Sequence, residues 1–242
     1  MSKKIIAVAL AIVMIAVMFT ACSKKLRVEK IQGKDHAVMT DKDGNVIVDE
    51  NNRVQAIVTD NAGEVVTFEN GEPQTYWVPI TNYFVADGKL YTPIYTLASV
   101  KGWEMNTSGA MEKDGSEGKC KITVAKVLTK DYEDATLDEY LKFKEEQDKV
   151  ATPEFEKQGY KISYTKETVS LTEDNIQMIS YKVIIYNKDG SIANYAETLY
   201  FQLNKSDKYS IHYASESGVG YDEKFDFRAF VNENFDLVKT DK

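Results

Sequence analysis

Cysteine and histidine, the side chains that most often act as nucleophiles, general bases or zinc ligands, are rare in this chain of 242 residues. The cysteines are Cys22 and Cys120, and the histidines are His36 and His212. Cys120 lies in the strand-like run CKITVAKV without an accompanying histidine pattern, so we expect a buried, inert thiol rather than a nucleophile. The two histidines are far apart in the sequence, whereas zinc ligands are usually closely spaced. We therefore predict no metal site.

Carboxylates are abundant, with 38 Asp and Glu residues against 30 Lys and Arg residues and a formal net charge of -8. Acidic residues that are adjacent in the sequence, such as Glu133 with Asp134 and Asp138 with Glu139, are of the type that forms the paired catalytic carboxylates of a hydrolase. In a chain this acidic, such pairs are usually solvated, and the sequence has no Ser-His-Asp or Cys-His pattern and no G-x-S-x-G turn. We predict no catalytic residue and no cofactor. The acidic charge argues against a nucleic-acid partner, because phosphates need a basic surface.

Calcium binding is a second chemistry to weigh, because Asp41, Asp43 and Asp49 lie close together in the sequence. An EF-hand loop carries a glycine at its sixth position and an acidic ligand at its first. With Gly44 as the sixth residue, Met39 would occupy the first position. We therefore interpret these acids as surface turn residues.

The first 21 residues are typical of a secretory signal peptide. Lys3 and Lys4 precede an apolar run, Ile5–Phe19, which is shorter than the roughly 20 residues of a membrane span. An uncleaved signal anchor is the alternative. It is disfavoured because the basic residues after the run outnumber those before it, the opposite of the bias for a cytoplasmic N-terminus.

The end of this segment, Phe19-Thr20-Ala21-Cys22, resembles the lipobox of bacterial lipoproteins, with Phe19 in place of the usual leucine. The resemblance implies that the thiol of Cys22 receives a diacylglyceryl group and that cleavage makes Cys22 the first mature residue. We therefore expect a lipid-anchored protein on the extracytoplasmic side of the cell membrane. Cys120 is then the one remaining thiol, so stability must come from packing without an internal disulfide.

A short duplication follows, because residues 39–57 and 58–76 agree at several positions. The matching pairs include Thr40 with Thr59, Asp41 with Asp60, Gly44 with Gly63 and Val46 with Val65. Turn residues separate short β-branched runs, a pattern that indicates successive hairpins. We predict a polar tether over residues 22–38 and a thin β-hairpin spacer over residues 39–80.

The C-terminal region has the pattern of an α+β domain. Residues 136–150 should form a helix that starts with a capping box of Thr136 and Glu139 and ends before Pro153. The runs IQMISYKVIIYN, YAETLYFQLN and KYSIHYA, joined by short turn-rich segments, predict an antiparallel meander. A final helix should carry Phe225, Phe227 and Phe230 and end near Phe235.

Alternation along the three strands predicts one core face, formed by Tyr181, Val183, Ile185, Leu199, Phe201, Leu203, Tyr209 and Ile211. On the opposite face, Tyr186, Tyr200 and His212 combine aromatic rings with polar tips and are candidates for contact with a partner. A second interpretation stays open, in which a loop or the segment around Trp103 covers this face and makes Tyr200 and His212 semi-buried sheet residues.

The order of these elements resembles the PsbP-like fold over residues 90–242. The resemblance rests on the strand ending in KGWEMN, the TLDEY helix, the meander and the closing YDEKFDFRAFVNENF helix. It implies an antiparallel sheet packed against helices, in proteins that serve as binding or assembly modules. We therefore expect a non-catalytic binding module whose partner is an envelope protein or a glycan. The alternatives are a hydrolase of cell-envelope polymers and a transporter-associated solute receptor.

Overall fold

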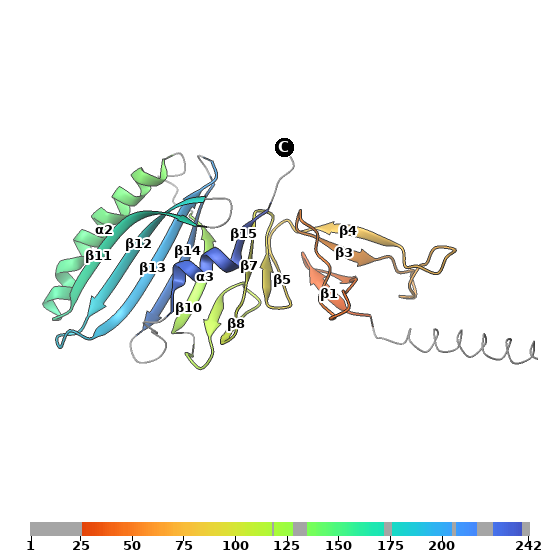
Figure 1. Ribbon diagram of the computed structural model, residues 1–242, viewed down its shortest axis with the longest axis horizontal. Coiled ribbons are helices and arrows are strands. Elements are labelled where there is room, and N and C mark those ends of the chain that lie inside the picture. Colours follow the sequence, from red (N-terminus) through yellow and green to blue (C-terminus); the bar gives the residue numbers. More distant parts are fainter. Residues whose placement is uncertain are drawn as a thin grey trace, which may run out of the picture. The chain divides into compact units, whose positions relative to one another are not determined.

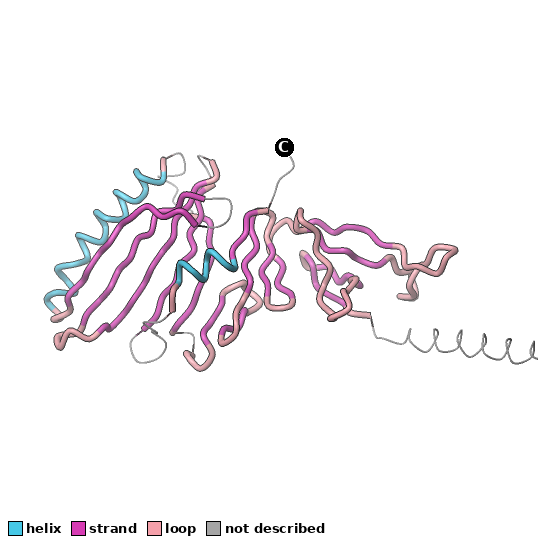
Figure 2. Tube along the Cα trace, viewed as in Figure 1, coloured by secondary structure: helices cyan, strands magenta, loops and turns pink. Residues whose placement is uncertain are grey.

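The computed structural model describes residues 26–117, 119–127, 135–171, 176–204, 207–216 and 225–238. The chain divides into two compact units, Met1–Asp49 with Arg53–Val78, and Glu50–Asn52 with Pro79–Lys242. Antiparallel sheets dominate both units, and helices α2 and α3 belong to the second (Figures 1 and 2). The predicted signal peptide and Cys22 lie outside the described residues. None of the described helices is long and apolar enough to cross a membrane.

The first unit begins with a hairpin of β1 (Val28–Ile31) and β2 (Lys34–Ala37), within the segment predicted as a tether. Gln32 and Gly33 form its two-residue turn, and both have positive φ, 51° and 80°. Two consecutive residues with positive φ give a turn whose twist matches that of the flanking strands. The segment predicted as a polar tether therefore contains a β-hairpin over residues 28–37.

Hydrogen bonds in the rest of the first unit recur at an interval of 19 residues. The bond from the Met39 N–H to the Gln55 carbonyl is repeated from Val58 to Gln74, both at 2.9 Å. The same interval relates the bridge between Thr40 and Val46 to the bridge between Thr59 and Val65. This unit also contains a two-stranded sheet of β3 (Arg53–Ile57) and β4 (Thr75–Pro79).

Aspartates close the turns of this first unit. The carboxylate of Asp41 accepts backbone hydrogen bonds from Asp43 and Asn45, each at 2.9 Å, and Asp60 does the same 19 residues later. The bond from the backbone of Asn45 is the main reason that the pKa of Asp41 lies below its usual value. Asp41 thus has a structural role in its turn.

The second unit is built on a seven-stranded antiparallel sheet in the order β11-β12-β13-β14-β10-β9-β8. The strands are β8 (Trp103–Met105), β9 (Met111–Lys113), β10 (Cys120–Lys126), β11 (Lys161–Leu171), β12 (Ile176–Tyr186), β13 (Ile192–Gln202) and β14 (Lys208–Glu216). The predicted antiparallel order of β12, β13 and β14 is correct. Strand β11, which extends the meander by one neighbour, was missing from the prediction.

A second, four-stranded sheet has the order β15-β7-β6-β5. Its strands are β5 (Phe84–Ala86), β6 (Lys89–Tyr91), β7 (Tyr95–Ala98) and β15 (Phe235–Leu237). Because β5 pairs with β6, the second unit includes residues that precede the predicted boundary at residue 90. The chain returns to this sheet at its end, where Phe235 pairs with Leu97.

Helix α2 (Leu137–Lys157) starts as predicted, with reciprocal hydrogen bonds between Thr136 and Glu139. The prediction that it ends before Pro153 is wrong, because the helix continues through this residue. Pro153 and Lys149 are both exposed, so the carbonyl that lacks an N–H partner can bond to water. Helix α3 (Phe227–Asn234) follows its N-cap Asp226, and Phe235 is its C-cap, close to the predicted end.

The register of the large sheet corrects the predicted core face. Tyr181 lies opposite Thr198, and Ser180 lies opposite Leu199. Residues directly opposite each other share a face, so Tyr181, Val183 and Ile185 point away from the side of Leu199 and Phe201. A one-residue shift in the register of two adjacent strands moves the side chains of one strand to the opposite face of the sheet. When both faces are covered, the sequence pattern does not exclude such a shift.

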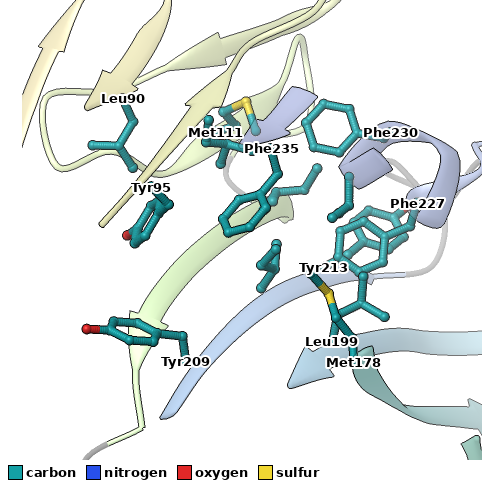
Figure 3. Packing of buried hydrophobic residues seen from close by; sticks show 14 of the residues in the cluster. Leu90, Tyr95, Met111, Met178, Leu199, Tyr209, Tyr213, Phe227, Phe230 and Phe235 are labelled. Atoms are coloured by element: carbon teal, nitrogen blue, oxygen red, sulfur yellow. The ribbon is translucent and has the colours of Figure 1, made fainter. Parts of the chain in front are cut away.

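Both faces of this sheet are in fact covered. One face packs against α3 and the four-stranded sheet, where Leu97, Met111, Leu199, Phe201, Ile211, Phe227 and Phe235 form a continuous core with the buried thiol of Cys120 (Figure 3). The other face packs against α2, where Leu137 and Leu141 contact Tyr181 and Tyr200. The expected burial of Cys120 is correct.

Candidate functional site

The predicted partner residues do not form one open surface. Tyr200 is 6% exposed and lies against Tyr140 of α2, with ring centroids 5.9 Å apart. His212 shares this face, is half-buried and lies 2.8 Å from the hydroxyl of Thr198 through its Nδ1. Burial, together with Lys121 and Lys144, lowers the pKa of His212. Tyr186 belongs by alternation to the opposite face and lines a separate hollow beside Tyr160.

A buried ionic cluster on the α3 side of the sheet is the second region that combines reactive side chains. Glu197 is 3% exposed and accepts hydrogen bonds from Arg228 at 2.7 Å, Tyr195 at 2.7 Å and Ser180 at 2.8 Å. Lys182 lies 3.7 Å away. Burial alone would raise the pKa of Glu197, but these hydrogen bonds outweigh it and lower the pKa. Every carboxylate oxygen is occupied, so this cluster fastens α3 to the sheet.

The third region is a cavity of about 420 Å³ in the second unit, which we call the tyrosine pocket after Tyr83, Tyr95 and Tyr209. Strands β6 and β7 and their turn form one side, and β10 and β14 form the other. The remaining lining residues are Thr81, Asn82, Leu90, Thr92, Pro93, Ile94, Ser108, Val124, Ala125 and Lys126. Its size is within the range of ligand sites, about 300–1,000 Å³.

Two phenol rings form the inner wall of the tyrosine pocket. Tyr95 is 7% exposed and Tyr209 is 6% exposed, and their rings meet edge to face with centroids 6.2 Å apart. Figure 3 shows both hydroxyl oxygens on the same side, away from Met111 and Phe235 of the core. Within the described part of the chain, neither hydroxyl has a hydrogen-bond partner. Because both hydroxyls face the cavity, each is available to water or to a ligand.

Both phenols stay protonated at neutral pH. Burial, and then the neighbouring Tyr209, raises the pKa of Tyr95 to about 12. Burial and the nearby carboxylate of Asp207 raise the pKa of Tyr209. Each hydroxyl can therefore donate one hydrogen bond and accept others.

The turn that carries Tyr95 is held rigidly. The hydroxyl of Thr92 accepts the N–H groups of Ile94 at 3.2 Å and Tyr95 at 2.9 Å, and donates to the Tyr95 carbonyl at 2.9 Å. The buried side-chain amide of Asn52 donates to the Thr92 carbonyl at 2.6 Å. These bonds fix Pro93 and Ile94 at the rim, so this side of the pocket is organised before any ligand arrives.

The pocket carries little net charge. Among the described residues that line it, Lys126 is the charged one, and its ammonium lies 2.8 Å from the carboxylate of Asp207. Across the described ranges, no group of three histidine, cysteine or acidic side chains could hold a metal ion. The arrangement of rings and neutral hydroxyls is suited to binding a small ligand, and the described lining residues include no histidine, cysteine or acidic side chain.

Sequence reasoning did not find this pocket. It placed Tyr209 on the core face, where its ring indeed lies, but the pattern did not show that its hydroxyl leaves the core. Tyr83 lies between the two predicted regions, and Tyr95 lies near the start of the predicted domain at residue 90. The run of three tyrosines with Pro93, from residue 83 to residue 95, was the available signal.

Comparisons with protein-family models, with curated proteins and with solved structures found no match. The side chains of the tyrosine pocket therefore provide the strongest basis for inferring what the protein binds.

Proposed function

We propose that this protein is a lipid-anchored extracytoplasmic lipoprotein that works as a non-catalytic binding module, with the tyrosine pocket as its ligand site. The observation that carries the proposal is the pair of buried phenol hydroxyls, Tyr95 and Tyr209, which face a cavity and lack partners within the described residues. Buried polar groups are normally hydrogen-bonded, to protein, water or a ligand, so two hydroxyls that face a cavity without a protein partner are positions where a ligand can bind.

The anchor in this proposal is Cys22, supported by the lipobox-like sequence before it. The hairpin repeat predicted over residues 39–80 would act as a spacer between the anchor and the binding unit. A PsbP-like arrangement of the second unit is consistent with its antiparallel sheet and two helices, and with a role as a binding or assembly module. Such a fold sets no activity by itself.

Two alternatives are less well supported. A hydrolase of envelope polymers needs a pair of acid and base groups in a cleft, whereas the buried carboxylate of Glu197 is fully occupied by Arg228, Tyr195 and Ser180. A transporter-associated solute receptor usually has two lobes of alternating strands and helices. The described part of the second unit has consecutive antiparallel strands instead.

The anchor can be tested with a Cys22→Ala variant. We expect this variant to stay uncleaved or to leave the membrane, because the acyl attachment site is gone. Intact-mass measurement of wild-type protein extracted from membranes should show a chain that starts at residue 22 and carries a diacylglyceryl group. The control is Cys120→Ala, which should remain in the membrane. A wild-type chain that keeps residues 1–21 and a free thiol at Cys22 would contradict the proposed anchor.

The ligand site can be tested by removing both hydroxyls in a Tyr95→Phe/Tyr209→Phe variant, which retains the rings. The probe is the low-mass fraction of cell-envelope polymers after muramidase digestion. A ligand tenfold above its Kd stabilises by about 1.4 kcal/mol, so the wild-type Tm should rise by about 3–6 °C, and the variant's Tm should rise less. An equal rise in Tm for wild type and variant, or no rise for the wild type, would contradict the assignment of the tyrosine pocket as the ligand site. Chromatography of the same mixture should show intact probe, and cleavage would favour the hydrolase instead.

A further inference from the structure

We infer that the ligand of the tyrosine pocket is an uncharged oligosaccharide segment, which hydrogen-bonds to the hydroxyls of Tyr95 and Tyr209 and rests against the apolar rim. This inference depends on the proposed binding function and adds to it the chemical class of the ligand. It follows from three properties of the pocket: its hydrogen-bonding groups, its charge and its mixture of rings with aliphatic surface.

The hydrogen-bonding groups are the first step. The buried polar atoms that face the cavity are neutral hydroxyls, which both donate and accept. At the exposed rim, Thr81 and Asn82 add a hydroxyl and an amide. A purely apolar ligand would leave these groups unpaired, whereas the hydroxyls of a sugar can pair with each of them.

The charge is the second step. The ammonium of Lys126 is neutralised by the carboxylate of Asp207 at 2.8 Å. An anionic ligand would therefore have to compete with Asp207 for Lys126, and a cationic ligand would find no carboxylate on the described lining. Burying an unpaired charge is strongly unfavourable. A neutral sugar avoids this cost, and a uronic acid or an amino sugar with a free amine does not.

The surface is the third step. Tyr83 is an exposed lining residue of the pocket, and the buried rings of Tyr95 and Tyr209 meet edge to face. Pro93 and Ile94 supply aliphatic surface at the rim. A pyranose ring has a C–H face and a hydroxyl edge, so it matches a wall that combines rings with polar tips. A cavity of about 420 Å³ has room for a segment about the size of a disaccharide.

The experiment is calorimetric titration of the full mature chain with four probes. Two are neutral oligosaccharides, cellotriose and N,N′-diacetylchitobiose. The third is the cationic dimer of glucosamine, and the fourth is N-acetyl-leucinamide, a neutral molecule that is not a sugar. We expect binding of at least one neutral oligosaccharide. Each hydroxyl removed, in Tyr95→Phe or Tyr209→Phe, should weaken that binding about two- to tenfold.

Tyr186→Phe is the matched control, because it removes a phenol hydroxyl from a different hollow and should leave the affinity unchanged. If N-acetyl-leucinamide or the glucosamine dimer binds in a Tyr95- and Tyr209-dependent way while the neutral sugars do not, the saccharide inference is overturned and the binding function stands. If none of the four probes binds, the saccharide inference is overturned. If the envelope digest also gives no Tm shift, the proposed binding function is overturned with it.

Discussion

Replacement of Arg228 by alanine should lower the free energy of unfolding by about 3 kcal/mol. Arg228 donates to the buried carboxylate of Glu197 at 2.7 Å and to the hydroxyl of Ser180 at 3.0 Å, and it also binds Glu167. Removing one partner of a buried ion pair costs about 3–5 kcal/mol because a charge is left uncompensated. We expect the lower end of this range, since Tyr195 would still donate to Glu197 and Lys182 lies nearby.

The same variant should have a distinctive pH dependence. The folded-state pKa of Glu197 is lowered, so its contribution to stability is present above its ordinary value of 4.5 and is lost as the pH falls through the lowered pKa. Loss of Arg228 removes a main cause of this lowering. The difference in unfolding free energy between wild type and Arg228→Ala should therefore narrow below about pH 4.5.

Urea unfolding at several pH values measures both effects. Lys157→Ala is the matched control, because its ion pair with Glu154 is highly exposed on α2 and should change stability by less than about 0.5 kcal/mol. A second variant, Arg228→Ala/Glu197→Gln, removes the stranded charge and should recover part of the loss. If Arg228→Ala behaved like Lys157→Ala at neutral pH, the ionic cluster would have no structural role.

Replacement of Phe235 by alanine should destabilise the second unit by about 3–5 kcal/mol, the usual cost of a large cavity in a core. Its ring is fully buried and lies 5.4 Å from the ring of Tyr95 and 5.4 Å from that of Phe201, measured between centroids. It therefore joins the four-stranded sheet to the seven-stranded sheet. Because Tyr95 loses its stacking partner, ligand binding in the tyrosine pocket should also weaken.

Thermal and urea unfolding test this second expectation. Phe155→Ala on α2 is the control, because this ring is 37% exposed and its loss should cost much less. Phe235→Leu, which leaves a smaller cavity, should cost less than Phe235→Ala. Equal destabilisation by Phe235→Ala and Phe155→Ala would mean that the core of the second unit does not depend on the ring of Phe235.

The elements that could be predicted from sequence are those encoded locally. The capping box of Thr136 and Glu139 lies within one helical turn, so the start of α2 was clear. Its end was not, because proline removes a helical hydrogen bond and usually stops a helix, whereas here Pro153 and Lys149 are exposed and water can bond to the unpaired carbonyl. The hairpin at Gln32 and Gly33 was missed because glutamine rarely adopts positive φ.

The sheet register and the candidate site depend on contacts between distant residues. Strand β12 carries apolar side chains at both alternations, such as Met178 toward α3 and Tyr181 toward α2, so its pattern does not choose a face. The tyrosine pocket brings together Tyr95 and Tyr209, which belong to different sheets. A local sequence pattern contains no information about a contact between two sheets. The pattern around Tyr209 is the same as that of other aromatic residues predicted to lie in the core.

The burial of Cys120 has a practical consequence for how this molecule ages. Its sulfur is enclosed and lies 3.9 Å from the hydroxyl of Tyr213, so oxidants and alkylating agents meet it only when β10 separates from its neighbours. Modification of the thiol therefore reports local opening of the seven-stranded sheet. The rate of modification reports how often β10 is released, and a chain that never opens keeps its thiol reduced even in an oxidising compartment.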